Sequence, residues 1–279
     1  MANVLYPPPR PQSVGEILDS AFRIFRATLV KSLPYAVAAV IAGQLPNIYY
    51  LLSGRSMLQG ITGQFRDPAW DALYILGYLI AVVLWSAVLL RQYGLATGHP
   101  ADTSSELSTA VRRLPAMVLL GILTGCAIGI WFVPGLALQG TARLGALLLL
   151  AIPACYMAVA LSCGWAVLLV TGKGAVASLM HSYRLTSGSF WRLTLIYTVA
   201  FVLLMVLYMV SGLIAGLVSL LLGHGDIAVI TAATTGFVVI LSAVGTPFFW
   251  ALALAVLGDL SVRKEGADLA QRLSTPAAS

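Results

Sequence analysis

Long apolar runs alternate along the chain with short segments that carry most of its charge. Six runs have the length needed to cross a bilayer, which is about 20 mostly apolar residues. They lie at 33–53, 72–92, 116–138, 144–170, 193–221 and 228–258. None alternates apolar and polar residues as barrel strands do, so each is expected to be a helix. The pattern predicts an all-α integral membrane bundle of six transmembrane helices.

Composition points to lipid as the solvent for most of the chain. Of the 279 residues, 59% are apolar and only 9% are charged, and the mean hydropathy is +0.93. Soluble domains carry roughly 25% charged residues, which keep their surfaces hydrated. We therefore expect most of the surface to face a membrane.

The segments outside the apolar runs divide the chain into three parts. Residues 1–12 are rich in proline and lack the apolar core of a cleaved signal, so we expect an extended, flexible lead. Residues 13–262 are expected to form the six-span membrane domain, which includes any interfacial helices. Residues 263–279 are expected to form a cytoplasmic tail.

Basic residues are concentrated on one side of the predicted membrane domain. Thirteen of the 16 Lys and Arg residues fall in segments that share a side with both termini. The positive-inside rule places that side, and so both termini, in the cytoplasm. A basic surface either sets topology alone or also attracts anionic phospholipid headgroups or a protein partner. The candidate contact residues are Arg23, Arg26, Arg112, Arg113, Arg184, Arg192, Arg263 and Lys264.

Three segments on this side have helical periodicity but are too polar to span. In the first, Ser13 and Glu16 fit a capping box that opens an amphipathic helix. We expect cytoplasmic amphipathic helices that lie in the membrane interface. Corresponding positions are Leu18, Leu107 and Leu179; Phe22, Val111 and Tyr183; and Arg23, Arg112 and Arg184. The chain either repeats a unit of interfacial helix plus transmembrane hairpin three times, or its linkers resemble one another by chance.

Polar groups are scarce inside the spans. Gln44 and Asn47 are the most polar residues of the first run. They either hydrogen-bond to a neighbouring helix or line a cavity, and they are the candidate intramembrane polar contacts. The ionisable residues at span ends are expected to snorkel to the interface. These are Asp71, Arg91, Arg143 and Asp259.

Glycines in two spans form small faces. Gly121, Gly125 and Gly129 make overlapping GxxxG steps, and Gly212 and Gly216 make another. Such faces let helix backbones approach closely. The close contacts are expected either within the monomer or between subunits.

The sequence holds no recognisable catalytic or metal-binding pattern. The three histidines are far apart, and no HExxH, GxSxG or P-loop pattern occurs. The three cysteines all lie in apolar runs and are expected to be small core residues. We expect no catalytic residue, no cofactor, no metal and no nucleic-acid partner.

Three stretches together resemble a known family. They are SVGEILDSAFRIFR at 13–26, SYRLTSGSFWR at 182–192 and DLSVRKEGADL at 259–269. In order and spacing they are similar to motifs of bacterial proteins with the glycerophosphoryl diester phosphodiesterase membrane domain. The closing motif of that family commonly has an aromatic residue before the Asp and an Arg two residues after it, where this chain has Gly258 and Ser261.

The resemblance implies a six-span domain of the bacterial inner membrane, with a poorly defined role. It does not imply diesterase activity, which belongs to a separate catalytic domain that we expect this chain to lack. The leading expectation is a non-enzymatic protein that scaffolds or regulates a partner, or a homo-oligomer, in envelope or lipid homeostasis. The alternative is a transporter or a lipid-handling protein.

Overall fold

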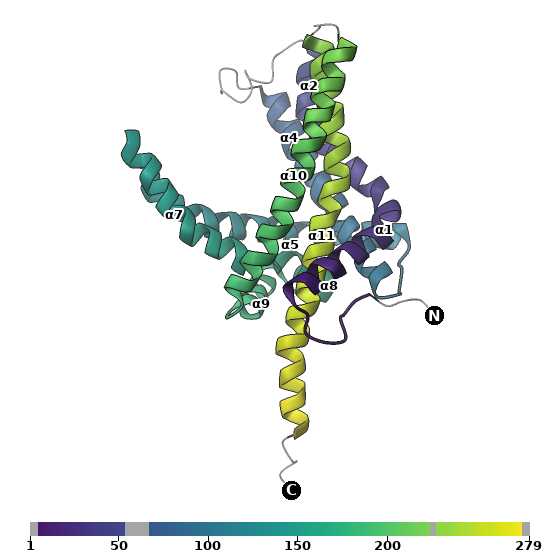
Figure 1. Ribbon diagram of the computed structural model, residues 1–279, viewed down its shortest axis with the longest axis vertical. Helices are drawn as coiled ribbons and strands as arrows, with labels where there is room; N and C mark the ends of the chain where they lie inside the picture. Colours follow the sequence, from purple (N-terminus) through teal and green to yellow (C-terminus); the bar gives the residue numbers. More distant parts are fainter. Residues whose placement is uncertain (1–4, 54–66, 224–226, 275–279) are drawn as a thin grey trace.

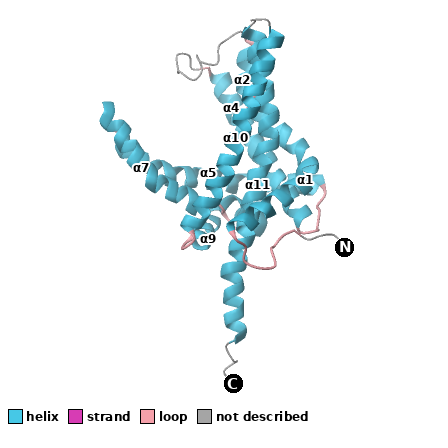
Figure 2. Cartoon of the chain, in the orientation of Figure 1, coloured by secondary structure: helices cyan, strands magenta, loops and turns pink. Residues whose placement is uncertain are grey.

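The computed structural model describes residues 5–53, 67–223 and 227–274, which form helices joined by short turns (Figures 1 and 2). The α-helices of this part confirm the all-α prediction. In chain order they are α1 (Val14–Gly43), α2 (Leu45–Leu52), α4 (Pro68–Ala96), α5 (Thr103–Gly129), α6 (Val133–Leu136), α7 (Gly140–Ala160), α8 (Gly164–Thr171), α9 (Ala175–Thr186), α10 (Phe190–Gly223) and α11 (Ile227–Ser274). A single 3-10 turn, η1 (Ile130–Phe132), joins α5 to α6.

Six helical stretches of the described part are long and apolar enough to cross a membrane. They are Val14–Gly43, Pro68–Ala96, Thr103–Leu136, Gly140–Thr171, Phe190–Val218 and Val239–Lys264. Each overlaps one of the six apolar runs, and the chain is a multi-pass membrane protein. The boundaries differ from prediction in several places: the run 33–53 is divided between α1 and α2, and the run 144–170 between α7 and α8. The first two amphipathic segments continue without a break into the spans that follow them, whereas the third forms the separate helix α9.

Helix α1 begins as the sequence indicates. The Ser13 side chain accepts a hydrogen bond from the Glu16 backbone, and the Glu16 carboxylate accepts one from the Ser13 backbone at 2.7 Å. This confirms the capping box. Buried residues then recur every three or four positions, which gives α1 one continuous face toward α11 and α4. Thr28 lies on this face, and its hydroxyl donates to the Ile24 carbonyl at 2.8 Å, so burial leaves no donor unpaired.

The helices do not form a parallel bundle along their whole length. Helices α10 and α11 run alongside each other, whereas α7 extends away from them to one side (Figure 1). Large apolar side chains are exposed on α7 and α10, among them Leu148 at 74% and Leu213 at 67%. Lipid tails are the solvent that such surfaces require.

Three helices begin at corresponding positions of the suggested repeat. Helices α1, α5 and α9 start at Val14, Thr103 and Ala175, which are offset as the aligned leucines are. Exposure also follows the alignment, because the three leucines are half-buried and the residues aligned with Phe22 and Arg23 are all exposed. These agreements support the alignment of the three amphipathic segments with one another. The three-unit repeat stays a prediction.

Among the described glycines, the one with the least free space is Gly77, which belongs to neither GxxxG face. A Cβ atom placed on Gly77 would lie only 2.3 Å from the Ala42 carbonyl oxygen, where α4 crosses α1. By contrast, a Cβ atom on Gly125, Gly129 or Gly212 would meet nothing within 4 Å, and the same holds for Gly216. At Gly121 a Cβ atom would lie 3.5 Å from the Tyr78 hydroxyl, an ordinary contact. Among the described residues, the GxxxG positions are therefore not places of close backbone approach.

We predict that Gly77→Ala destabilises the protein while Gly125→Ala does not. Replacing Gly by Ala in a helix interior ordinarily gains roughly 0.5–1 kcal/mol, but at position 77 the methyl group overlaps backbone. The melting temperature of each purified variant in detergent should therefore fall for Gly77→Ala and stay level or rise for Gly125→Ala. Equal shifts in both variants would contradict the crossing of α1 and α4 at Gly77.

Candidate functional site

A buried carboxylate in α11, near the C-terminal end of the last span (Val239–Lys264), binds two arginines. Asp259 is 1% exposed, and its Oδ2 lies 2.9 Å from Arg192 Nη1 and 2.9 Å from Arg263 Nε. Its Oδ1 accepts a hydrogen bond of 2.7 Å from the Gln12 backbone N–H. The expectation that Asp259 snorkels to the interface is wrong. A buried charge requires partners of this kind, because desolvation otherwise makes it very costly.

The backbone of Gln12 completes the arrangement. Its carbonyl oxygen accepts from Arg263 Nη2 at 2.6 Å and from Arg192 Nη2. We call Gln12, Arg192, Asp259 and Arg263 the Asp259 cluster. It joins the N-terminal lead, the first turn of α10 and the end of the last span in α11, segments that lie far apart in the sequence. Each of the three stretches that carry the family resemblance contributes to this cluster or directly adjoins it.

The described part of the lead packs against the helices, in contrast to the flexible segment that was expected. The backbone N–H groups of Leu5 and Tyr6 donate to the Ala96 carbonyl at 2.8 and 3.1 Å. The Tyr6 ring meets the ring of Tyr93 edge to face, with centroids 5.5 Å apart. Proline fixes φ and so restricts the chain, but here tertiary contacts set the position of the lead.

Gly258 provides the space into which the lead packs. A Cβ atom at this position would lie 2.8 Å from Tyr6 Cε2 and 2.9 Å from Pro8 Cδ. The residue that departs from the aromatic of the family pattern is therefore the one against which Tyr6 rests. In this chain the aromatic ring of Tyr6, which belongs to the N-terminal lead, lies next to position 258.

A polar hollow of about 690 Å³ lies on the other side of Gln12, between the lead and the start of α1. We call it the N-terminal groove. It is lined by Pro9, Arg10, Gln12, Glu16, Asp19, Phe22, Arg23 and Arg26. Arg10 forms an ion pair with Glu16 at 2.7 Å, and Arg23 donates to the Ser20 hydroxyl at 3.1 Å. Within the described residues, the side chains of Asp19 and Arg26 have no bonded partner.

A second buried ion pair ties α4 to α5. Arg91 Nε lies 2.9 Å from Glu106 Oε2, and the Tyr35 hydroxyl of α1 donates to the same oxygen at 3.1 Å. Arg91 also donates to the Thr103 hydroxyl at 2.9 Å. Snorkelling was expected of Arg91, but its side chain is mostly buried in this contact. Asp71 and Arg143, which were expected to behave in the same way, are exposed.

Two further basic residues stabilise helix ends. Arg113 donates to the carbonyls of Leu168, at 3.0 Å, and of Leu169 near the end of α8. Lys264 donates at 2.6 Å to the carbonyls of Arg184 and Ser187 at the end of α9. Free carbonyls at a helix C-terminus attract cations in this way.

The eight predicted contact residues therefore divide into four pairs. Arg192 and Arg263 belong to the Asp259 cluster, Arg23 and Arg26 line the N-terminal groove, and Arg113 and Lys264 bind helix carbonyls. Arg112 and Arg184 are exposed, and within the described residues their side chains have no bonded partner. Sequence reasoning missed Asp259 and Gln12 as functional residues. The spacing of Asp259 and Arg263, one helical turn apart, was the available signal.

The predicted intramembrane polar residues, Gln44 and Asn47, contact each other over a separation of three residues. Asn47 Nδ2 donates to Gln44 Oε1 at 2.6 Å, at the corner between α1 and α2. Within the described residues, the two side chains bond to each other and not to a neighbouring transmembrane helix. At this corner, each side chain thus provides a hydrogen-bond partner for the other.

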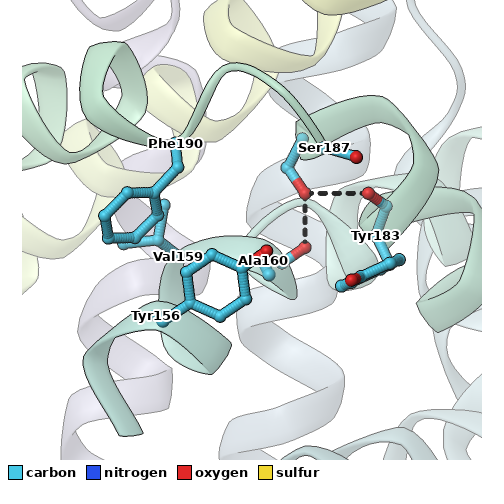
Figure 3. A pocket seen from close by; sticks show the side chains of 7 residues that line it. Tyr156, Val159, Ala160, Tyr183, Ser187 and Phe190 are labelled. Atoms are coloured by element: carbon cyan, nitrogen blue, oxygen red, sulfur yellow. Dashed lines mark hydrogen bonds between the residues drawn. The ribbon is translucent and has the colours of Figure 1, made fainter. Parts of the chain in front are cut away.

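A small pocket between α7, α9 and α10 has room for about one water molecule, with a volume of about 10 Å³. Figure 3 shows Tyr156 and Phe190 on one side of it and Tyr183 and Ser187 on the other. Thr186 closes the junction by donating to the Ala160 carbonyl at 2.9 Å. The pocket is a helix junction and not a ligand site.

Within residues 5–53, 67–223 and 227–274, no cluster of three or more His, Cys, Asp or Glu side chains could hold a metal ion. The three cysteines are free; Cys163 is buried, whereas Cys126 and Cys155 are exposed. Only Cys163 is thus the core residue that was expected.

We predict that Asp259→Asn destabilises the protein strongly. Removing one partner of a buried ion pair costs on the order of 3–5 kcal/mol, with the lower end expected because Arg263 is partly exposed. The melting temperature should fall, and proteolytic cleavage within residues 5–12 should become faster. Asp71→Asn, at an exposed position of α4, is the control. A similar small shift in both variants would contradict the structural role of Asp259.

We also predict that Tyr6 and Gly258 are energetically coupled. Gly258→Phe should lower the melting temperature, because its ring needs the space that Tyr6 occupies. In the Tyr6→Ala background the same change should cost less, since contacting residues show coupling energies of roughly 0.5–3 kcal/mol. A double-mutant cycle of unfolding free energies measures the difference. Additive effects would show that the lead does not rest on Gly258.

Comparisons of the chain with protein families, with curated proteins and with solved structures found no match.

Proposed function

We propose that this chain is a non-enzymatic protein of the bacterial inner membrane that scaffolds or regulates a partner, in envelope or lipid homeostasis. One observation carries the proposal. Four exposed basic side chains on the side of the termini have no bonded partner within the described part: Arg26, Lys31, Arg112 and Arg184. Only two acidic side chains there, Asp19 and Asp102, are equally free.

The division between paired and free charges supports this function. Paired basic residues hold segments of the chain together, as Arg192 and Arg91 do, and are not available to a partner. The free ones carry a net positive charge, which suits an acidic partner surface or anionic headgroups. In the described part both buried carboxylates, Asp259 and Glu106, are held by arginine. A general acid–base pair would need freedom that these groups lack.

We also propose that the termini lie in the cytoplasm and that the chain belongs to the family it resembles. The uneven distribution of basic residues supports the orientation. The meeting of the opening, middle and closing stretches near Gln12, Arg192 and Asp259 supports the family, because it gives all three a common structural role.

Lipid binding is the second candidate function, and the N-terminal groove is the observation that favours it. The transporter alternative rests on kinked spans, on the glycine faces and on Gln44 and Asn47, and the hydrogen bond between these two residues removes only that part of its support.

Photo-crosslinking in cells tests the leading function. A photoreactive amino acid is placed at Arg112 or at Arg184, and at Leu148 on the exposed face of α7 as control. We expect one discrete protein adduct, or a cross-linked dimer, from the first two positions and not from position 148. In mild detergent, the same species should co-purify with the wild-type chain and be reduced several-fold by Arg112→Gln with Arg184→Gln. A monomer without adducts would overturn the proposal.

The non-enzymatic part has its own test. Purified protein incubated with a glycerophosphodiester and Mg²⁺ should release no glycerol phosphate above a blank. Metal-dependent release, lost in a variant that still folds, would contradict it.

A further inference from the structure

The N-terminal groove presents unpaired groups of both signs. Arg26 and Asp19 are exposed and have no bonded partner within the described part, and Arg23 bonds only to a neutral hydroxyl. These three residues lie one turn apart on α1 and line the same hollow. Arg10 and Glu16, in contrast, neutralise each other. The groove thus offers two guanidinium groups and one carboxylate to a ligand.

The surroundings of the groove carry a positive excess. Three arginines and two carboxylates line the groove: Arg10, Arg23, Arg26, Glu16 and Asp19. The adjoining Asp259 cluster adds two arginines and one carboxylate: Arg192, Arg263 and Asp259. Together these make five positive charges and three negative charges. Arginine binds phosphate oxygens through paired N–H groups. The excess of two charges therefore favours a phosphate over a neutral ligand.

Gln12 adds a buried acceptor to the groove wall. The residue is 9% exposed, its Nε2 donates to Ser20 at 2.8 Å, and its Oε1 has no hydrogen-bond partner. Its backbone is fixed by the Asp259 cluster at both the N–H and the carbonyl. An unpaired buried acceptor carries a desolvation cost that a donor group of a ligand would relieve.

An apolar stripe continues from the groove along α1. Phe22, Val30, Val37 and Ile41 lie on the same face of the helix as Arg26, and Val30 is 81% exposed. Phe22 also rests on Phe248 of α11, with ring centroids 4.6 Å apart. The stripe runs from the charged groups into the apolar part of the first span. A phospholipid has the same order of groups, because its charged headgroup is followed by apolar acyl chains.

We propose that the N-terminal groove binds the headgroup of a phospholipid that carries a phosphate followed by an ammonium group. The phosphate lies on Arg23 and Arg26, the ammonium donates to Asp19 and to the Gln12 side chain, and an acyl chain follows the stripe through Val30. The inference rests on the membrane setting of the proposed function but not on a protein partner. Either can fail while the other stands.

Native mass spectrometry of the purified full chain in a non-ionic detergent tests the site. The protein is titrated with phosphatidylethanolamine, with phosphatidylcholine, whose headgroup has no N–H donor, and with inorganic phosphate. Phosphatidylethanolamine should bind most tightly. Arg23→Gln with Arg26→Gln should weaken it about tenfold or more, because the phosphate loses both of its charged hydrogen-bond donors. Arg112→Gln with Arg184→Gln removes the same charge from the open surface and should change binding less than about twofold.

Two further variants separate the parts of the proposal. Asp19→Asn should abolish the preference for phosphatidylethanolamine over phosphatidylcholine, and Val30→Gln should weaken the lipid without changing phosphate binding. Melting temperatures near the wild-type value show that each variant is folded. If Arg112→Gln with Arg184→Gln weakened lipid binding as much as Arg23→Gln with Arg26→Gln, the effect would come from overall charge alone. That result would overturn the proposed site. Inorganic phosphate binding as tightly as the lipid would overturn the lipid assignment.

Discussion

The carboxylate of Asp259 is the constraint on which one end of this protein depends. An ionised group at 1% exposure in a membrane helix is tolerated only with opposite charge and hydrogen bonds around it. Arg192, Arg263 and the Gln12 backbone meet that need, and each is supplied by a different segment of the chain. Satisfying one charge therefore fixes the N-terminal lead, the start of α10 and the end of the last span in α11 relative to one another.

The same physical solution recurs where α4, α5 and α1 meet. Glu106 is as deeply buried as Asp259, and Arg91 and Tyr35 satisfy one of its oxygens. Arg113 and Lys264 extend this use of basic residues to the carbonyls at the ends of α8 and α9. Much of the positive charge that suggests a headgroup surface in the sequence is thus engaged inside the protein. The basic residues that are exposed and have no bonded partner within the described part are fewer, and each has a known position: Arg26, Lys31, Arg112 and Arg184.

Local signals made much of the fold predictable, whereas the candidate site depends on distant contacts. The apolar runs indicate the spans because length and hydropathy are local properties. Ser13 and Glu16 indicate the start of α1 because a capping box is complete within four residues. No local pattern pairs Asp259 with Gln12, which is 247 positions away. For the same reason Gly77 was missed, since only the crossing of α1 shows that its small size is needed.

Gln12 belongs both to the Asp259 cluster and to the N-terminal groove, and this shared position links the two thermodynamically. A ligand that contacts the Gln12 side chain binds the form in which the lead is docked. Such a ligand stabilises that form by mass action, and undocking of the lead weakens the ligand to the same degree. Gly258 strengthens the link, because a side chain at position 258 would have to displace Tyr6 and Pro8 of the docked lead. Gly258, where the resembled family commonly has an aromatic residue, would therefore influence how strongly the groove binds.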